Sequence, residues 1–133
     1  MDRLFLDANI LFSAAYRPNA GLQKFWKLKD VELCSSHYAL EEARINLRDQ
    51  EQRGRLTDLE KRVKLFDPVA QALPDGITLA EKDIPILLAA IAARATHLIT
   101  GALRDFGRLF GKRVEGALIL TPANYLKSRI GGQ

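Results

Sequence analysis

The sequence predicts a three-layer α/β fold, in which helices cover both faces of a central parallel sheet of four or five strands. Short β-rich runs alternate with helical segments along the chain, and parallel strands joined by crossover helices produce this alternation. One helical segment, within residues 83–94, is apolar almost all round. A helix without a polar face must be buried on most sides, so the other elements are expected to pack around this one.

The composition is that of an ordinary globular protein, and we expect residues 1–133 to form a single domain. With 47% hydrophobic and 27% charged residues, the chain does not have the composition of a disordered protein. No run of 18 apolar residues predicts a membrane span, and the N terminus lacks the pattern of a signal peptide. We therefore expect a cytoplasmic protein without a membrane partner.

The first strand and the helix after it open the chain. Residues 3–7 form a short β-rich run that ends at Asp7, and from Ala8 onward apolar residues recur at helical spacing. A turn cluster at residues 18–21 then precedes a second helical segment, residues 22–28. This strand and its helix are the first unit of the predicted alternation.

The second unit begins with a strand at residues 31–34. Two serines follow the strand and are expected to cap the next helix. Gly54, between two arginines, is expected to break that helix, and Pro68 confines the last segment of this unit to a sheet edge or a strand end. The two helices and the weak strand of this unit are predicted at residues 38–52, 56–63 and 64–69.

The last third of the chain holds the buried helix, a strand at residues 98–100, a glycine-containing loop and a strand at residues 117–120. A final helix is expected from Thr121, where threonine caps and Pro122 occupies the first helical position. In open parallel sheets, ligands bind at the carboxyl ends of the strands. The residues just after each strand are therefore the first candidates for a functional site.

Four acidic residues follow strands or begin helices at that edge. Each has an ordinary explanation, because acids commonly cap helices or oppose the helix dipole. As a set they call for a cation, since two unit charges about 4 Å apart repel by about 4 kcal/mol at an effective dielectric constant of 20. Oxygen ligands favour Mg²⁺ or Mn²⁺ over zinc. The four candidates are Asp7, Glu42, Asp83 and Asp105.

Four motifs resemble the PIN domain family in order and spacing, and together they extend over essentially the whole chain. The resemblance implies a Rossmann-like parallel sheet and Mg²⁺- or Mn²⁺-dependent cleavage of RNA phosphodiester bonds. Many bacterial members of this size are toxins neutralised by an antitoxin protein, and many form homodimers. The motifs are Leu6-Asp7-Ala8-Asn9-Ile10-Leu11, Tyr38-Ala-Leu-Glu-Glu42-Ala-Arg, Glu81-Lys-Asp83-Ile-Pro-Ile-Leu and His97-Leu-Ile-Thr-Gly101-Ala-Leu-Arg-Asp105-Phe106.

The resemblance also implies roles for individual residues. The four acids match the catalytic acids of the family, and Asp7, Asp83 and Asp105 are the expected metal ligands. One position departs from the pattern: where members that read Thr-Gly at this turn usually continue with Asp, this chain has Ala102. The supporting polar residues are Asn9, Ser13 and Thr100.

Because position 102 is an alanine, the sequence does not decide whether the protein cleaves RNA. Loss of an outer-shell partner typically lowers metal affinity or activity 10- to 100-fold, so the hypothesis is a metal-dependent endoribonuclease that Ala102 impairs. The alternative is a non-catalytic module that binds RNA or a partner protein. A nucleotide-binding or phosphatase-like protein is disfavoured, because no glycine-rich loop follows the first strand and residues 7–9 lack an Asp-x-Asp pair.

Basic residues are concentrated near the C terminus, where residues 94–129 contain seven Lys or Arg against two acids. Such a cluster is typical of a surface that holds an RNA backbone through salt-sensitive phosphate contacts. It is also compatible with a solvated basic surface, because a net charge of +4 discriminates weakly. The predicted RNA-binding residues are Arg104, Arg108, Lys112 and Arg113.

Overall fold

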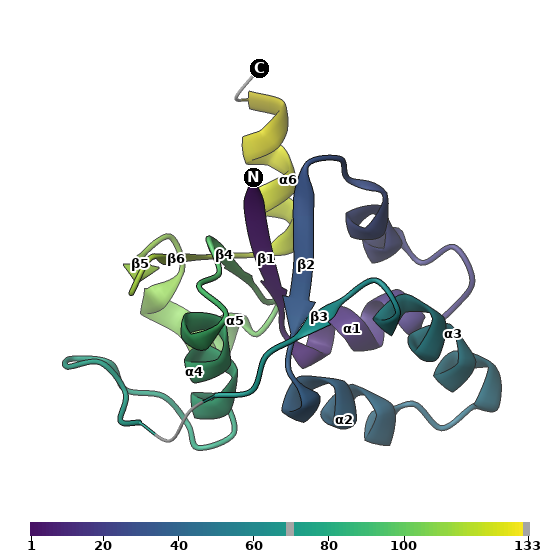
Figure 1. Cartoon of the computed structure of the whole chain (residues 1–133), viewed down its shortest axis with the longest axis horizontal. Helices are drawn as coiled ribbons and strands as arrows, with labels where there is room; N and C mark the ends of the chain where they lie inside the picture. The colour runs from purple at the N-terminus through teal and green to yellow at the C-terminus, as the bar shows by residue number, and fades with distance from the viewer. Residues whose placement is uncertain (69–70, 132–133) are drawn as a thin grey trace.

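The computed structural model describes residues 1–68 and 71–131, and Figure 1 shows a central sheet flanked by helices. Within the described residues the sheet has six strands, five of them parallel to their neighbours. The strands are β1 (Asp2–Leu6), β2 (Val31–Ser35), β3 (Lys64–Leu65), β4 (His97–Ile99), β5 (Arg113–Val114) and β6 (Ala117–Leu120). Their order across the sheet is β3-β2-β1-β4-β6-β5.

The predicted α/β fold with a parallel sheet is confirmed, but the sheet exceeds the four or five strands expected. The additional strand is β5, which pairs antiparallel with β6. Glu115 and Gly116 connect the two strands with φ values of 48° and 90°. A two-residue hairpin turn with both φ values positive usually contains Asn-Gly or Asp-Gly. Because this turn contains Glu-Gly, the sequence did not predict it.

The helices lie between the strands in the predicted alternation. Helix α1 contacts both α2 and α3, whereas α4 contacts α2 and β4 (Figure 1). Two of the helical segments, η1 and η2, have 3₁₀ geometry. The segments are α1 (Ala8–Ala15), η1 (Gly21–Lys27), α2 (His37–Asn46), α3 (Gln50–Glu60), α4 (Ile84–Ala92), α5 (Leu103–Phe106), η2 (Gly107–Leu109) and α6 (Pro122–Gly131).

The boundary between α2 and α3 differs from the prediction. A single helix was expected to reach residue 52 and to break at Gly54, whereas α2 ends before Leu47 and Gly54 lies inside α3. Asp49 starts α3 with a capping box, accepting from the backbone N–H of Glu51 while Gln52 accepts from the N–H of Asp49. The cap and the helix after it outweigh a cost of about 1 kcal/mol for an exposed helical glycine.

The weak strand predicted at residues 64–69 is formed only at Lys64 and Leu65, which pair with the end of β2. Val69, the end of that prediction, lies outside the described residues. Within residues 1–68 and 71–131, no helix combines the length and the apolar character that crossing a lipid bilayer requires.

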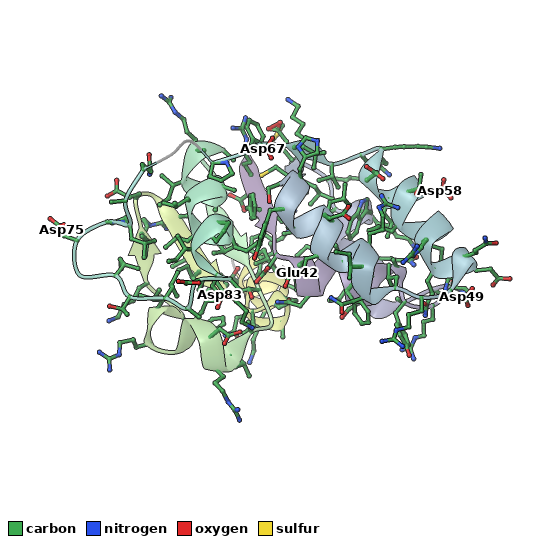
Figure 2. The ribbon with its side chains drawn as sticks, turned by 90° about the horizontal axis from the view of Figure 1, so that it is seen from below. Glu42, Asp49, Asp58, Asp67, Asp75 and Asp83 are labelled. Atoms are coloured by element: carbon green, nitrogen blue, oxygen red, sulfur yellow. The ribbon has the colours of Figure 1, made fainter. Side chains whose placement is uncertain are left out.

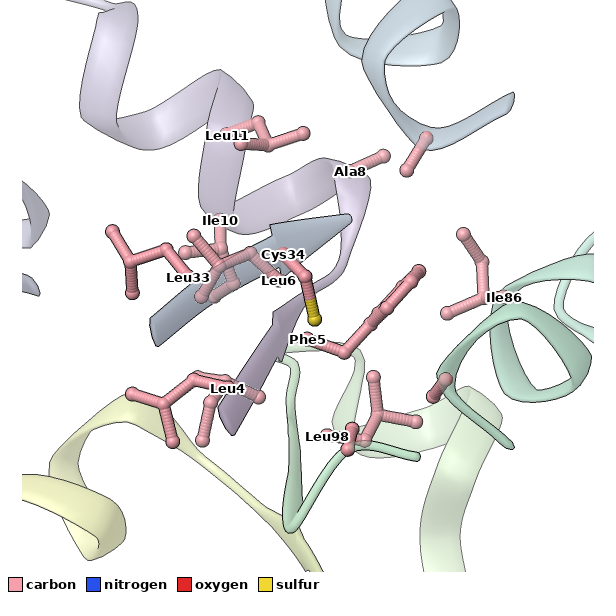
Figure 3. Close-up of a cluster of buried hydrophobic side chains, with 14 of the residues drawn as sticks. Leu4, Phe5, Leu6, Ala8, Ile10, Leu11, Leu33, Cys34, Ile86 and Leu98 are labelled. Atoms are coloured by element: carbon pink, nitrogen blue, oxygen red, sulfur yellow. The ribbon is translucent and has the colours of Figure 1, made fainter. Parts of the chain in front are cut away.

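The core surrounds β1 and α4. Leu4, Phe5 and Leu6 have no exposed surface, so β1 is covered on both faces, as a central parallel strand should be (Figure 3). The five consecutive residues 86–90 of α4 are buried, which confirms the prediction of a buried helix. Cys34 of β2 is also fully buried, and burial raises the pKa of its thiol to about 12, so it acts as a small apolar residue.

Candidate active site

Asp7 and Thr100 meet where two neighbouring strands end. Leu6 of β1 pairs with Ile99 of β4, so the next residue of each chain segment lies at the same edge of the sheet. The Thr100 hydroxyl donates to Oδ2 of Asp7 at 2.7 Å, and the backbone N–H of Ala8 donates to Oδ1 at 2.6 Å. Asp7 therefore caps α1, as expected of an aspartate there, and its carboxylate is fixed from both sides.

Asn9 connects α1 to the turn after β4. Its side-chain amide donates to Oδ2 of Asp7 at 3.1 Å and to the Thr100 hydroxyl at 3.3 Å. Its Oδ1 accepts the backbone N–H of Gly101 at 2.9 Å. The Thr100 hydroxyl in turn accepts the N–H of Ala102 at 3.1 Å. Asn9 and Thr100, two of the three polar residues predicted as helpers, thus hold both Asp7 and the turn that contains Ala102.

A cavity of about 640 Å³ opens beside this network and collects the predicted acids. Figure 2 shows Glu42 and Asp83 close together near the middle of the molecule, whereas the other labelled aspartates lie at its periphery. We call this cavity the acidic pocket. Of the predicted residues, its lining includes Asp7, Asn9, Ser13, Glu42, Asp83 and Asp105, together with Ala102. Thr100, which has no exposed surface, lies directly behind Asp7.

The carboxylates of the acidic pocket disfavour ionisation of one another. Burial is the main cause that raises the pKa of Asp7, and the charge of Glu42 raises it further, while bonds from Thr100 and Ala8 lower it. Burial also raises the pKa of Asp83, followed by the charge of Asp105. A cation in this pocket would therefore stabilise the ionised side chains.

Asp83 is the clearest indication that the pocket suits a cation. The residue is 5% exposed, yet its Oδ2 has no hydrogen-bond partner, and its carboxylate does not cap α4. A buried oxygen without a partner is costly, and a hard divalent cation is the partner that such oxygens prefer. The donor set fits Mg²⁺ or Mn²⁺ in its chemistry. In the described part of the chain, however, no three acidic, histidine or cysteine side chains form a ready-made ligand group.

The structure adds residues to the site that were not predicted. Lys82 lines the acidic pocket and its Nζ lies 3.0 Å from Oδ2 of Asp105. Asn46 lines the same pocket, one helical turn after Glu42, and donates to the Glu42 carbonyl. The Tyr38 hydroxyl donates to the backbone carbonyl of Lys82 at 3.0 Å. The spacing of four residues between Glu42 and Asn46 could have predicted that Asn46 lies at the site. The Lys82–Asp105 ion pair could not be predicted in this way, because the two residues are 23 positions apart in the sequence.

The predicted RNA-binding residues do not line the acidic pocket. Arg104 and Arg108 line a separate cavity of about 380 Å³, although Arg104 is next to Asp105 in the chain. Lys112 and Arg113 lie at the hairpin of β5 and β6, where the Arg113 guanidinium donates to the Gly116 carbonyl. All four residues are exposed, and Arg113 belongs to β5, the strand at one edge of the sheet.

Comparisons with known proteins concern the fold. No family model matches the chain, and no curated protein matches it. The chain is similar to one chain in the crystal structure of VapBC2 from Rickettsia felis bound to a DNA fragment from their promoter. The TM-score is 0.64 and the sequence identity 18%, and the match covers 90% of this chain and 98% of the other. At this identity, the comparison establishes that the two chains share a fold.

Proposed function

We propose that this protein is a PIN-type endoribonuclease that hydrolyses RNA phosphodiester bonds with Mg²⁺ or Mn²⁺ and serves as the toxin of a toxin–antitoxin pair. The observation that carries the proposal is the acidic pocket, which collects four carboxylates from the ends of parallel strands and the helices that follow them. The fold shared with a chain of VapBC2 supports it. A third support is the resemblance of the four sequence motifs, which contain the same four acids, to the PIN family.

In this proposal, Asp7, Asp83 and Asp105 hold the cation and Glu42 supplies further negative charge. A cation held there would supply activation of a water molecule and neutralisation of the charge on the phosphate. The protein orients its own carboxylates: the Thr100 hydroxyl holds Oδ2 of Asp7. No serine or cysteine nucleophile is required.

Ala102 weakens the proposed activity. It occupies the N-cap position of α5 and lines the acidic pocket, and no side-chain hydrogen bond caps this helix. An aspartate at this position would supply both a cap and a further oxygen donor. We therefore expect Ala102→Asp to increase metal affinity and RNA cleavage at least about 10-fold.

A second candidate function is a binding module that has lost turnover. Two observations favour it: Ala102 replaces the expected acid, and no complete ligand group is formed within the described residues. Such a module would bind RNA or a partner protein without cleaving RNA.

The deciding experiment is an RNA cleavage assay with Mg²⁺, Mn²⁺ or EDTA on the native chain, Ala102→Asp and Asp7→Asn. We expect metal-dependent cleavage that increases in Ala102→Asp and is lost in Asp7→Asn. Asp58→Asn is the matched control, because Asp58 is an exposed residue of α3 whose carboxylate pairs with Lys61. If no protein cuts RNA and Asp7→Asn binds Mn²⁺ as the native chain does, the nuclease proposal is wrong.

The toxin part of the proposal requires an antitoxin partner and is compatible with a homodimer. The chain that shares this fold belongs to VapBC2, and by analogy with it we propose a partner protein for this chain. Light scattering on the purified chain tests the homodimer. Growth arrest on expression of Ala102→Asp, relieved by a co-expressed neighbouring gene product, tests the antitoxin.

A further inference from the structure

A second cavity lies beside the acidic pocket, and the proposed function does not yet use it. Its volume is about 740 Å³, within the range of ligand-binding cavities. We call it the aromatic pocket. The two pockets are contiguous, because five residues line both: Phe12, Ser13, Leu22, Gly101 and Pro122.

The two pockets have opposite character. Among the described residues, no carboxylate lines the aromatic pocket, whereas four line the acidic pocket. The charged residues of the aromatic pocket are Arg17 and Lys24, both exposed. Its walls are otherwise mainly apolar, and two of the most exposed apolar residues of the protein belong to them: Tyr16 is 53% and Leu103 is 64% exposed. This combination suits a ligand with a flat apolar face and an adjoining negative charge.

The aromatic wall is formed by the end of α1. The rings of Phe12 and Tyr16 lie with their centroids 5.3 Å apart and inclined by 41°. The Tyr16 carbonyl accepts two hydrogen bonds from α3, one from Gln52 at 3.0 Å and one from Arg55 at 3.1 Å. Because α3 already holds the backbone of Tyr16, stacking of a ligand on its ring costs little conformational entropy of the protein backbone.

We propose that the aromatic pocket binds a nucleobase of single-stranded RNA next to the phosphate that lies in the acidic pocket. The base stacks on the Tyr16 ring, and Arg17 and Lys24 contact flanking phosphates. The substrate class rests on the proposed function, whereas the position of the base rests on the continuity and charge of the two pockets. Stacking on an aromatic ring accepts every base, and basic side chains hold the backbone.

The charges explain why an RNA strand would use this side. Four carboxylates repel a polyanion from the acidic pocket itself, so affinity for RNA must come from an adjoining surface. The arginines at 104 and 108 line a different cavity, which shares only Asp105 with the acidic pocket. The aromatic pocket shares five residues with it and has no acid in its lining. The aromatic pocket is therefore the better binding site for the next nucleotide of an RNA whose phosphate occupies the acidic pocket.

The test compares two fluorescently labelled hexamers by anisotropy in EDTA, so that no cleavage occurs: hexauridylate, and a ribose-phosphate hexamer without bases. We expect Tyr16→Ala to bind hexauridylate about 5-fold or more weakly and to bind the abasic hexamer as the native chain does. Tyr16→Phe keeps the aromatic face and should bind as the native chain does. The double variant Arg17→Gln/Lys24→Gln should bind both hexamers more weakly and show a shallower salt dependence.

Two further variants keep the test decisive. Leu103→Ser changes the opposite wall at an exposed position and should weaken binding of hexauridylate even if Tyr16→Ala fails to fold. Ile45→Ala is the matched control, since Ile45 is 63% exposed but lines neither pocket. It should bind both hexamers as the native chain does.

The proposal is overturned if the native chain does not bind hexauridylate, or if Tyr16→Ala and Leu103→Ser bind it unchanged. It is also overturned if Tyr16→Ala weakens both hexamers equally. If light scattering instead shows that the two variants alter the oligomeric state and leave RNA binding unchanged, the pocket is an interface between copies. Because binding is measured without turnover, Tyr16-dependent binding in a chain that never cleaves RNA would uphold this inference and refute the nuclease.

Discussion

Thr100→Val tests whether the buried hydroxyl beside Asp7 organises the acidic pocket. Threonine and valine side chains have nearly the same shape, so the change removes the hydroxyl and leaves the packing around position 100 intact. Thr100 has no exposed surface, and its hydroxyl makes a 2.7 Å bond to Oδ2 of Asp7. In the variant, that oxygen retains only the 3.1 Å bond from Asn9.

The expected loss follows from the charge of the acceptor. A hydrogen bond to a charged group typically contributes about 1.5–3 kcal/mol to the free energy of unfolding. For a chain of 133 residues, the entropy of unfolding is about 0.28 kcal/mol/K. The melting temperature should therefore fall by about 5–11 °C at neutral pH.

The loss of stability in Thr100→Val should depend on pH, and the pKa of Asp7 determines whether it increases or decreases as pH rises. Burial raises the pKa of Asp7 in the folded protein, so the native chain loses stability as pH rises from about 4 through that pKa. The Thr100 hydroxyl lowers this pKa, and removing it raises the pKa further. The difference in stability between native chain and variant should therefore increase as pH rises through the pKa of Asp7, in addition to a pH-independent loss from the bonds that the hydroxyl accepts from Asn9 and Ala102.

Urea unfolding in EDTA near pH 4 and near pH 8 measures the difference. Ser35→Ala is the matched control, because the Ser35 hydroxyl is equally buried and donates at 2.7 Å to the uncharged carbonyl of Leu6. Its loss of stability should be the same at both pH values. The reasoning is refuted if Thr100→Val loses as much stability near pH 4 as near pH 8, or less than about 1 kcal/mol at neutral pH.

Two further predictions concern the pocket and the core. The Lys82→Met variant should bind Mn²⁺ more tightly in calorimetry, because the change frees the Asp105 carboxylate from its ion pair and removes a positive charge from the acidic pocket. Lys61→Met is the control: it breaks an exposed ion pair with Asp58, and this variant should bind Mn²⁺ as the native chain does. Unchanged affinity in Lys82→Met would contradict this. Leu56→Ala, at a fully buried position of α3, should lower the free energy of unfolding by about 2–5 kcal/mol in urea titrations; a loss below about 1 kcal/mol would mean that α3 contributes little to the core.

The fold was predictable where burial and sequence pattern agree. The β-rich run at residues 3–7 predicted the first strand, and the apolar helix within residues 83–94 predicted a buried helix; the structure has β1 at Asp2–Leu6 and a buried α4 at Ile84–Ala92. The boundaries that failed depended on local competition. At Gly54, the capping box at Asp49 outweighs the low helix propensity of glycine, and at Glu115 a residue that is rare in tight hairpins occupies one. Propensity alone does not decide such cases.

The candidate site was predictable to the extent that topology determines it. Acids that follow parallel strands had to reach one edge of the sheet, and the acidic pocket collects all four. The other features of the site could not be predicted, because they combine residues that are far apart in the sequence. Lys82 reaches Asp105 only because the start of α4 lies beside α5, and the aromatic pocket combines residues of α1, η1, α5 and α6. The basic residues after position 103 lie near Asp105 in the sequence but do not line the acidic pocket.

Lys82 and Ala102 act in the same direction on the charge of the acidic pocket. With the four acids ionised and Lys82 protonated, the lining residues have a net charge of −3, and an aspartate at position 102 would make it −4. Less charge means less repulsion between the carboxylates, so the pocket can persist without a cation. The same reduction weakens its attraction for a divalent ion. Mg²⁺ should therefore raise the melting temperature of Ala102→Asp more than that of the native chain, because a ligand stabilises the fold according to its affinity.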